Sequence, residues 1–294
     1  MKNNITLYYV GTKGINFGDS INPVLFERIF GVCVKRGFPT NCDVVGIGSL
    51  MQMFTLRHII KNSKYLYFLK YNYKPVVTMG TGFCCDISKF NFGIQTYREV
   101  NPLILRGRLS HEVLESVNKK RYSGVVYGDL GLLCSYLQDK KTIKRYAVGF
   151  VPHKFDYDNP KIEFLLRSIP KSVLIDLREP PIETLNKIAE CDTIVSSSLH
   201  GLVAADSLGI PNMRMKLSNH GFDFNVDFKF DDYNSVFSGS RRYINLIDVE
   251  NIEGSLLSEF MPDKICGDYG ISGSEIKSCQ DSLLVEGRKF FEFI

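Results

Sequence analysis

The stretch from Asp192 to Pro211 constrains the fold of this chain more than any other part of it. A β-branched run at 193–195 has no polar alternation, which is typical of a strand buried in a parallel sheet. Three serines follow, and apolar residues then recur at helical spacing, at Leu199, Val203, Ala204 and Leu208. Gly209 and Pro211 predict the end of that helix. The stretch therefore predicts a strand, a serine turn and a helix.

This arrangement places His200 in the first helical turn, above the carboxyl end of the strand, where open α/β sheets bind ligands. The free backbone N–H groups of a helix start and the hydroxyls of Ser197 and Ser198 predict a site for phosphate or carboxylate. Gly201 would let a ligand approach the backbone, and His200 can move a proton near neutral pH. The alternative is that His200 only caps or packs the start of the helix.

Glycine-rich turns follow three other predicted strands. The strands are expected at Ile5–Val10, Asp43–Ile47 and Val76–Met79. Because the carboxyl ends of parallel strands share one edge of a sheet, the turns predict one functional rim. Asn16, Asp19 and Gly48 are candidate contacts there, although Asn16 and Asp19 could simply close the turn and cap a helix. The glycines of the first turn do not match the dinucleotide fingerprint, so no nicotinamide cofactor is predicted.

Two arginines and an aspartate follow further predicted strands. Arg106 and Arg108 flank a glycine after the strand Pro102–Leu105, and together they predict a fork for a carboxylate or phosphate. Surface ion pairing is the alternative. Ser110 is expected to cap a helix that begins at His111. Asp129 follows another short strand, and a helix is expected over 130–137.

The second half of the chain repeats the pattern. The basic segment Lys140–Arg145 is expected to be a linker, after which the strand Tyr146–Val151 ends at His153. His153 could face a cleft between two domains or serve as a hydrogen-bonding group in its loop. Further elements are expected as strands at Ser172–Asp176 and Asn212–Leu217 and as helices at Ile182–Ala189 and Ser274–Ile294. We therefore predict domains at 1–140 and 141–275 and a terminal helix at 276–294 that crosses back to the first domain.

Composition limits the class of protein. A chain of 294 residues with 44% hydrophobic and 23% charged residues is expected to form two globular domains. A net charge of +4, from 36 basic and 32 acidic residues, is too balanced to indicate nucleic acid as a partner. The eight cysteines lack zinc-ligand spacing, so no metal is predicted, and reduced thiols in a cytoplasmic protein are expected.

The sequence contains no secretion signal at its start and no apolar run long enough to span a membrane, which also favours a cytoplasmic location. The segment Arg57–Lys74 is rich in lysine and tyrosine. It could hold the protein at the inner face of a membrane as a peripheral contact, or it could be a solvated helix.

Several motifs, in order along the chain, resemble those of the polysaccharide pyruvyl transferases. The stretch from Ser196 to Pro211 is similar to the signature of that family. The other matching motifs are Asn16-Phe-Gly-Asp19, Val45-Gly-Ile-Gly-Ser49, Gly128-Asp129-Leu130, Val151-Pro-His153 and Lys229-Phe-Asp-Asp-Tyr233. Many members carry an arginine two residues before the histidine, where this chain has Ser198. The resemblance implies a GT-B-like α/β fold with two Rossmann-like parallel-sheet domains that face a cleft.

The resemblance also implies an activity. The family transfers a pyruvyl group from phosphoenolpyruvate to two hydroxyls of a sugar, which gives a cyclic ketal and phosphate, in exopolysaccharide or capsule biosynthesis. The acceptor would be a cell-surface polysaccharide or a polyprenyl-diphosphate-linked oligosaccharide, and no cofactor is implied. His200 would be the acid and Asp19 or Asp129 would orient or deprotonate the acceptor. Cations that could hold the donor in place of the missing arginine are Arg106, Arg108, Arg178 and Arg214, and Lys229 and His153 are further binding candidates.

Two other functions fit the same architecture. A GT-B glycosyltransferase that uses a nucleotide sugar would have the same rim of loops. A protein that binds a glycan or phosphate without catalysis would also fit, with Ser198 marking the loss of the donor-binding arginine.

Overall fold

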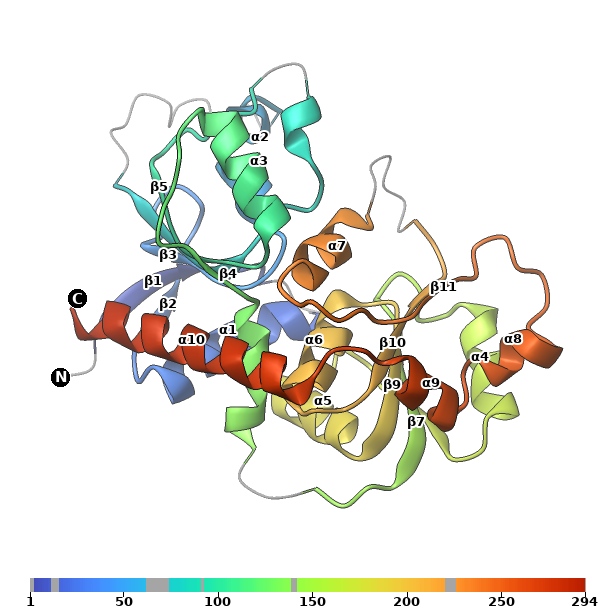
Figure 1. The fold of residues 1–294 in the computed structure, drawn as a ribbon. Helices are drawn as coiled ribbons and strands as arrows, with labels where there is room; N and C mark the ends of the chain where they lie inside the picture. Colours follow the sequence, from blue (N-terminus) through green and yellow to red (C-terminus); the bar gives the residue numbers. More distant parts are fainter. Residues whose placement is uncertain are drawn as a thin grey trace.

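The computed structural model describes residues 3–11, 16–61, 74–90, 93–138, 142–219 and 226–293. Its strands form two parallel sheets with helices packed around them (Figure 1). The six-stranded sheet has the order β2-β1-β3-β4-β5-β6 and the five-stranded sheet the order β11-β10-β9-β7-β8. The predicted α/β fold with two Rossmann-like units is therefore confirmed. We call the parts built on these sheets the first and the second lobe.

The first lobe contains the elements up to residue 137. They are β1 Asn4–Tyr8, α1 Phe17–Ile29, β2 Cys33–Arg36, β3 Val44–Val45, η1 Met51–Phe54, α2 Leu56–Lys61, β4 Val76–Thr81, η3 Ile87–Lys89, β5 Val100–Leu105, α3 Arg108–Asn118, β6 Val126–Tyr127 and η4 Leu130–Leu137. The segment η4 is a 3-10 helix where an ordinary helix was expected. The edge strand β2 was not predicted, because it is short and its residues are mostly exposed and partly charged.

The second lobe begins at Tyr146. Its elements are β7 Tyr146–Val151, α4 Pro160–Ser168, β8 Ser172–Leu174, α5 Pro181–Ala189, β9 Cys191–Ser196, α6 Leu199–Ser207, β10 Asn212–Lys216, α7 Phe228–Asn234, β11 Tyr243–Asn245, α8 Gly254–Ser258, α9 Pro262–Asp268 and α10 Gly273–Glu292. The strand β7 has the predicted bounds, whereas the edge strand β11 was not predicted. Edge strands bury little apolar surface and therefore leave a weak pattern in the sequence.

Both sheets follow the same doubly wound order. In the first sheet β1 lies between β2 and β3, and in the second sheet β7 lies between β8 and β9. The direction of winding therefore reverses between β1 and β3 in the first sheet and between β7 and β9 in the second. Open α/β sheets bind ligands outside the carboxyl ends of the strands at this switch point. The loops after these four strands are thus the places where a site is expected.

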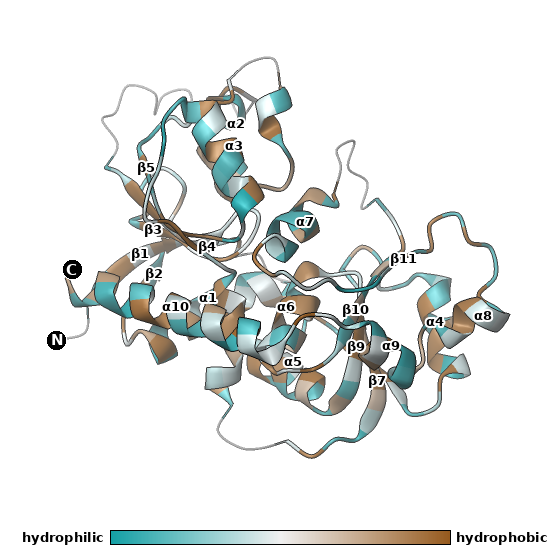
Figure 2. Ribbon diagram, viewed as in Figure 1, coloured by the Kyte–Doolittle hydropathy of each residue, from teal (hydrophilic) through white to brown (hydrophobic). Residues whose placement is uncertain are grey.

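One hydrophobic core joins the two lobes. It contains buried residues from α1, η4, α6 and α10 together with residues of both sheets, and smaller cores cover the outer face of each sheet. In Figure 2 brown, hydrophobic residues lie around β1 and β3 and along parts of β7 and β9, whereas β11 is mainly teal. Gly131 of η4 lies against α6, since a Cβ atom there would come within 2.9 Å of Val203. Burial of this apolar layer stabilises one relative placement of the lobes.

The last helix runs back along the first lobe, and the two chain ends lie close together (Figure 1). A capping box between Ser272 and Glu275 starts α10. Near its end, Phe291 packs on Phe26 of α1 and on Phe30, the C-cap residue of α1, with ring centroids 6.0 and 5.3 Å apart. The predicted domain boundary falls at 139–141, which lies outside the described residues, so the division at residue 140 stays a prediction.

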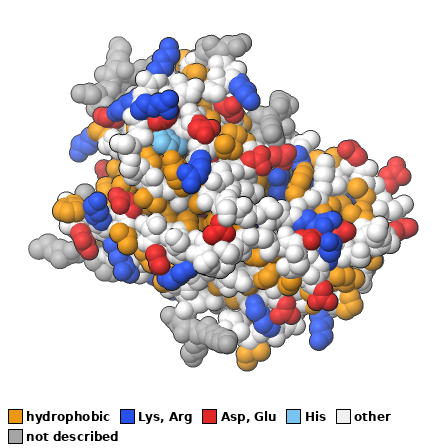
Figure 3. All heavy atoms as spheres, viewed as in Figure 1, with side chains coloured by type: hydrophobic (Ala, Val, Ile, Leu, Met, Phe, Trp, Pro, Cys, Tyr) orange, Lys and Arg blue, Asp and Glu red, His pale blue; other side chains and the backbone are white. Residues whose placement is uncertain are grey.

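Acidic and basic side chains are interspersed over the face of the molecule in Figure 3. Within the part of the chain that the structure describes, no helix has the length and apolar character needed to cross a bilayer. Most of the basic and aromatic segment 57–74 lies outside the described residues, so its expected role as a membrane contact or a solvated helix stays open.

Candidate functional site

His200 lies where the sequence predicted, in the first turn of α6 directly after β9. The helix ends at Ser207, and Gly209 then adopts a left-handed conformation with φ of 65°. The side chain of His200 is 12% exposed, although its Nε2 atom is buried. The reachable part of the ring is therefore a different edge from the one that carries Nε2.

The serine turn is held by its own hydrogen bonds, which differs from the prediction that its hydroxyls are free for an anion. The Ser196 hydroxyl donates to Val151 O at 2.7 Å and accepts from Ser198 N at 3.0 Å. The Ser197 hydroxyl donates to Asp156 Oδ2 at 2.7 Å and accepts from His153 N at 2.8 Å. Ser198 is the N-cap residue by position, but its side chain makes no capping bond. Among the described residues, the Ser198 hydroxyl and the backbone N–H groups at the start of α6 therefore remain to attract an anion there.

Two glycines determine how His200 is surrounded. A Cβ atom on Gly18 would lie 1.9 Å from His200 Nδ1, so the first turn of α1 lies directly against the imidazole. At Gly201 the missing Cβ faces the sheet, because a Cβ atom there would lie 2.4 Å from Ser196 Oγ and 2.8 Å from Val151, so its expected role in ligand approach stays a prediction. Gly201 therefore allows α6 to pack on the sheet, while Gly18 allows the two lobes to meet at His200.

The Nε2 atom of His200 faces Asp129 of the first lobe. Nε2 and Asp129 Oδ2 are 3.8 Å apart, and neither atom has a hydrogen-bond partner among the described residues. Burial raises the pKa of Asp129 to about 6, against the hydrogen bond that Oδ1 accepts from Gly131 N. Burial also lowers the pKa of His200 to about 3, helped by the charges of Lys229 and Arg106. Without a bound anion, His200 is a neutral imidazole.

Lys229 on α7 is a cation without a polar partner at this site. Its side chain makes no hydrogen bond or ion pair with any described residue, and its ammonium lies over the Phe230 ring at 5.2 Å. Burial, with the charges of Arg106 and Arg214, lowers its pKa to about 8. Because an unpaired ammonium is costly to hold in a partly buried position, a bound anion would stabilise it.

The predicted arginine fork is not formed, because each arginine is held by its own partners. Arg106 is fully buried and binds Asp232 of α7 with an N–O distance of 2.9 Å, and it also donates to Ser49 Oγ and to Phe83 O. Arg108 is exposed, donates to Ser235 O at 3.1 Å and lies over the Tyr127 ring. Arg106 thus contributes charge near His200, while Arg108 contributes to the contact between α3 and α7.

The other two candidate arginines are also paired. Arg214 is ion-paired with Asp227 and lies over the rings of Phe230 and Tyr243, and its buried Nε atom has no hydrogen-bond partner within the described part of the chain. Arg178 is bound to Asp176 through two nitrogens and is the more exposed of the two. Arg214 therefore lies close to Lys229, whereas nothing places Arg178 beside His200.

The loops of the first lobe supply three further candidates. Asp19 follows Gly18 in the first turn of α1, and burial raises its pKa to about 6 against the opposing charge of Lys154. Asn16 is the N-cap residue of α1 by position, and its buried Oδ1 atom has no hydrogen-bond partner among the described residues. Gly48 has φ of 125°, and its carbonyl accepts from Gly82 N at 3.1 Å. The first two residues therefore lie at the site, while Gly48 joins two neighbouring turns.

His153 makes hydrogen bonds within its own loop, which is one of the two roles expected for it. Its ring lies 5.2 Å from the Phe155 ring, and its Nδ1 atom accepts from Phe155 N at 3.4 Å. Its backbone N–H supports Ser197 as described above, and 8% of the residue is exposed. His153 therefore organises the loop after β7.

Sequence reasoning missed several polar residues that position the site. Asp232 accepts from Arg106, from Ser110 N at 2.7 Å and from Ser110 Oγ at 2.6 Å, so Ser110 does not cap α3 as predicted and Gly107 is the N-cap residue. Asn22 links α1 to the turn after β3, through Gly18 O and both backbone groups of Ile47. The only signal for Asp232 was its place in the motif 229–233.

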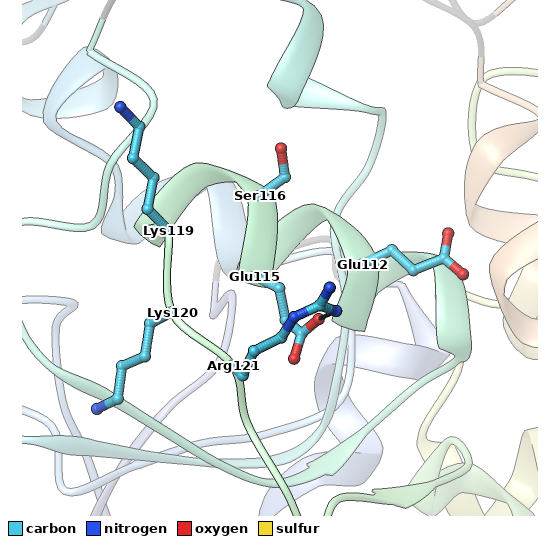
Figure 4. Close-up of a pocket in the computed structure, with 6 residues that line it drawn as sticks. All are labelled: Glu112, Glu115, Ser116, Lys119, Lys120 and Arg121. Carbon is cyan, nitrogen blue, oxygen red and sulfur yellow. Dashed lines mark hydrogen bonds and ion pairs between the residues drawn. The ribbon is translucent and has the colours of Figure 1, made fainter.

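Two hollows lie elsewhere on the described surface. One of about 360 Å³ lies at the carboxyl end of α3 and is lined by charged side chains, among them Glu115, Lys119 and Arg121 (Figure 4). The other, of about 420 Å³, lies between β6 and α10 and is lined by Arg108, Tyr127 and Phe237 among others. Of the predicted site residues, Arg108 alone lines either hollow, so neither marks the surroundings of His200.

Comparison with known families identifies the group to which this site belongs. The family model for polysaccharide pyruvyl transferases matches residues 2–217, which include both switch points and the whole strand, turn and helix around His200. The chain belongs to the polysaccharide pyruvyl transferase family. Membership indicates a transferase that moves a pyruvyl group to a sugar acceptor. In this family member Lys229 lies beyond the matched residues.

Individual proteins add little to the family assignment. An uncharacterized protein of Acanthamoeba polyphaga mimivirus, L143, is 29% identical to this pyruvyl transferase family member over 250 residues, which cover 82% of this chain and 78% of that protein. A crystal structure of a candidate UDP-N-acetylglucosamine 2-epimerase from Listeria monocytogenes has 10% identity and a TM-score of 0.42, over 99% of this chain and 94% of its own. At that TM-score the likeness supports no conclusion.

Proposed function

We propose that this protein transfers the pyruvyl group of phosphoenolpyruvate to two hydroxyls of one sugar, forming a cyclic ketal and releasing phosphate. The observation that carries the proposal is the meeting of both switch points at His200, where α1 of one lobe touches the imidazole of the other. Lys229 adds an unpaired positive charge at the same place.

The donor carries a carboxylate and a phosphate, and the site offers charge for both. Lys229 has no polar partner among the described residues and could bind one of them, and the backbone N–H groups at the start of α6 favour an anion. Arg106 and Arg214 add positive potential even though their guanidinium groups are paired. Lys229 is therefore our candidate for the cation that replaces the arginine absent at Ser198.

His200 is the proposed acid. In the ligand-free protein its pKa is lowered to about 3, chiefly by burial. A donor anion beside the ring would oppose Lys229 and Arg106 and raise that pKa, so the imidazole would gain a proton when the donor binds. The imidazolium can then protonate the methylene carbon of the enol while a sugar hydroxyl adds to the neighbouring carbon. The second hydroxyl then displaces phosphate from that same carbon.

Two carboxyl groups have distinct proposed roles. Asp19 is only partly buried and follows Gly18, so it is placed to take the proton of an acceptor hydroxyl. Its pKa of about 6 suits a base that must exchange protons near neutral pH. Asp129 is fully buried, so we assign it to His200, whose imidazolium it would stabilise, and not to the acceptor.

The acceptor class follows from the family alone. We propose a sugar of a cell-surface polysaccharide or of its polyprenyl-diphosphate-linked precursor, in exopolysaccharide or capsule biosynthesis. The reaction as written requires no cofactor or metal. A lipid-linked acceptor would bring this cytoplasmic protein to the inner face of the membrane.

The reaction is tested by incubating the protein with phosphoenolpyruvate and a panel of galactose- and mannosamine-containing acceptors. We expect phosphate release that depends on one acceptor, and a product heavier than that acceptor by one pyruvate less one water. Thermal shifts with UDP- and GDP-sugars run in parallel. Stabilisation by a nucleotide sugar, without stabilisation by phosphoenolpyruvate, would instead indicate a glycosyltransferase.

Lys229 gives a second test. Lys229→Met should raise KM for phosphoenolpyruvate about tenfold or more while the protein stays folded, because an ammonium bound to an anion contributes on the order of 1.5–3 kcal/mol. Lys277→Met is the matched control, since Lys277 is exposed on α10 and pairs with Asp281. An unchanged KM in the Lys229 variant would remove this residue from the donor site.

A further inference from the structure

Two adjacent cysteines lie beside the candidate site and have no role in the proposed reaction. Cys84 and Cys85 follow β4, and their sulfur atoms are 3.8 Å apart. Cys85 is buried, with 6% of the residue exposed, whereas Cys84 is partly exposed. Cys84 is therefore the member of the pair that a small reagent can reach.

The surroundings of Cys84 carry positive charge. Arg106 donates to Phe83 O, the carbonyl immediately before Cys84, and a Cβ atom on Gly82 would lie 2.6 Å from Arg106 Nη2. Lys229 is also close, since the charges of Lys229 and Cys84 each shift the pKa of the other. The hydrogen bond with Cys85 and the two cations lower the pKa of Cys84, against the effect of burial. All of these contacts favour the thiolate form.

The other cysteines differ from Cys84. Burial raises the pKa of Cys42, Cys134, Cys191 and Cys279, which leaves them inert thiols. Cys33 and Cys266 are exposed, and burial and nearby carboxylates raise the pKa of Cys266. Cys84 is thus the one cysteine that combines access with two neighbouring cations.

We propose that Cys84 is a site of covalent modification by thiol-selective electrophiles, and that a group attached to its sulfur blocks the binding of the anionic donor. The second half of this statement rests on the proposed function, because it assumes that the donor binds at Lys229. With iodoacetamide, the Cys84 sulfur forms a bond to the methylene carbon, the carbon–iodine bond breaks and iodide leaves. The proton of the thiol passes to solvent.

The experiment measures the labelling rate of each cysteine by peptide mass spectrometry, in the full chain with iodoacetamide at neutral pH. We expect Cys84 to be labelled faster than the exposed Cys33, and Lys229→Met to slow Cys84 labelling about threefold or more while leaving Cys33 unchanged. Phosphoenolpyruvate should slow Cys84 labelling in the wild type. Labelling of Cys84 that is slower than that of Cys33, or that ignores the Lys229 substitution, would overturn the proposal.

The labelling rate is measured without catalytic turnover, so it can be determined even if the protein does not catalyse the proposed reaction. Rapid, Lys229-dependent labelling that phosphoenolpyruvate does not slow would overturn the link between Cys84 and the donor, even if phosphate is released. If phosphate release is observed, Cys84→Ser should keep it and should resist inhibition by iodoacetamide. Equal inhibition of wild type and Cys84→Ser would also count against the proposal.

Discussion

His200 Nε2 lies 3.8 Å from Asp129 Oδ2, and neither atom has a hydrogen-bond partner among the described residues. The two side chains come from different lobes, and the distance is too long for a direct hydrogen bond. Both pKa values are shifted towards the uncharged form, chiefly by burial. The imidazole can therefore gain a proton when a bound anion raises its pKa, and the Asp129 carboxylate would then stabilise the imidazolium.

Replacement of the imidazole tests the proposed acid. His200→Gln should lower phosphate release by about 10²–10⁴-fold, which is the usual contribution of a positioned acid, while the protein stays folded. His111→Gln is the control, because that imidazole contacts Tyr127 and Glu115 instead. Steady-state rates and circular dichroism of both variants check this. Near-normal turnover by the His200 variant would refute the assignment.

The buried carboxyl of Asp129 predicts a pH-dependent stability. Its pKa is raised to about 6 in the folded protein, so between pH 4 and pH 6 the unfolded chain loses this proton first and the folded state is destabilised as the pH rises. Asp129→Asn does not titrate and keeps an acceptor for Gly131 N. The unfolding free energy of the variant relative to wild type should therefore increase by about 2 kcal/mol from pH 4 to pH 7.

Urea denaturation at several pH values measures that difference. Asp281→Asn, at an exposed position on α10, is the control and should show little change with pH. A difference between Asp129→Asn and wild type that stays constant over this pH range would mean that Asp129 is already ionised below pH 4 in the folded protein.

Contact between the lobes at Gly18 can be tested with one methyl group. In Gly18→Ala the Cβ atom would lie 1.9 Å from His200 Nδ1, so the imidazole must move and turnover should fall at least about tenfold. Gly273→Ala is the matched control, because a Cβ atom there meets nothing within 4 Å. The measurement is kcat for both variants. Equal kcat values would show that the position of the His200 ring is not critical for turnover.

The ion pair between Arg106 and Asp232 should contribute to stability far more than an exposed pair. Both side chains are 0% exposed, so Asp232→Ala leaves a buried guanidinium unpaired and should cost about 3–5 kcal/mol. Glu163→Gln breaks an ion pair with Arg167, in which the side chains of Glu163 and Arg167 are 65% and 79% exposed. This substitution should lower the free energy of unfolding by less than about 1 kcal/mol. Urea denaturation compares them, and similar losses would contradict the assigned burial.

His200 and its neighbours show how much of the structure the sequence predicts. Apolar periodicity, glycine turns and strand ends placed His200 at the start of a helix after a buried strand, and the structure confirms that position. These signals are local, since each depends on residues within a few positions of one another. The same reasoning predicted the strand at Tyr146–Val151 with its observed bounds.

Local sequence patterns could not predict the hydrogen-bond and ion-pair partners of the charged residues. Arg106 and Asp232 are 126 positions apart in the chain, and Ser110 contacts the same carboxylate instead of capping its helix. Nothing in the sequence distinguishes an arginine open to an anion from one that is already paired. For the same reason the sequence could not separate Lys229 from the four candidate arginines.

The sequence alone therefore determined most of the buried strands, the family resemblance and the turn that carries His200, because these follow from short-range patterns of apolar and turn residues. Only the tertiary structure decided that α1 touches the imidazole, that Asp129 faces it and that Lys229 has no polar partner among the described residues. Those relationships depend on distances between lobes that one shared hydrophobic core sets, and packing of that kind leaves no periodic signal in the chain.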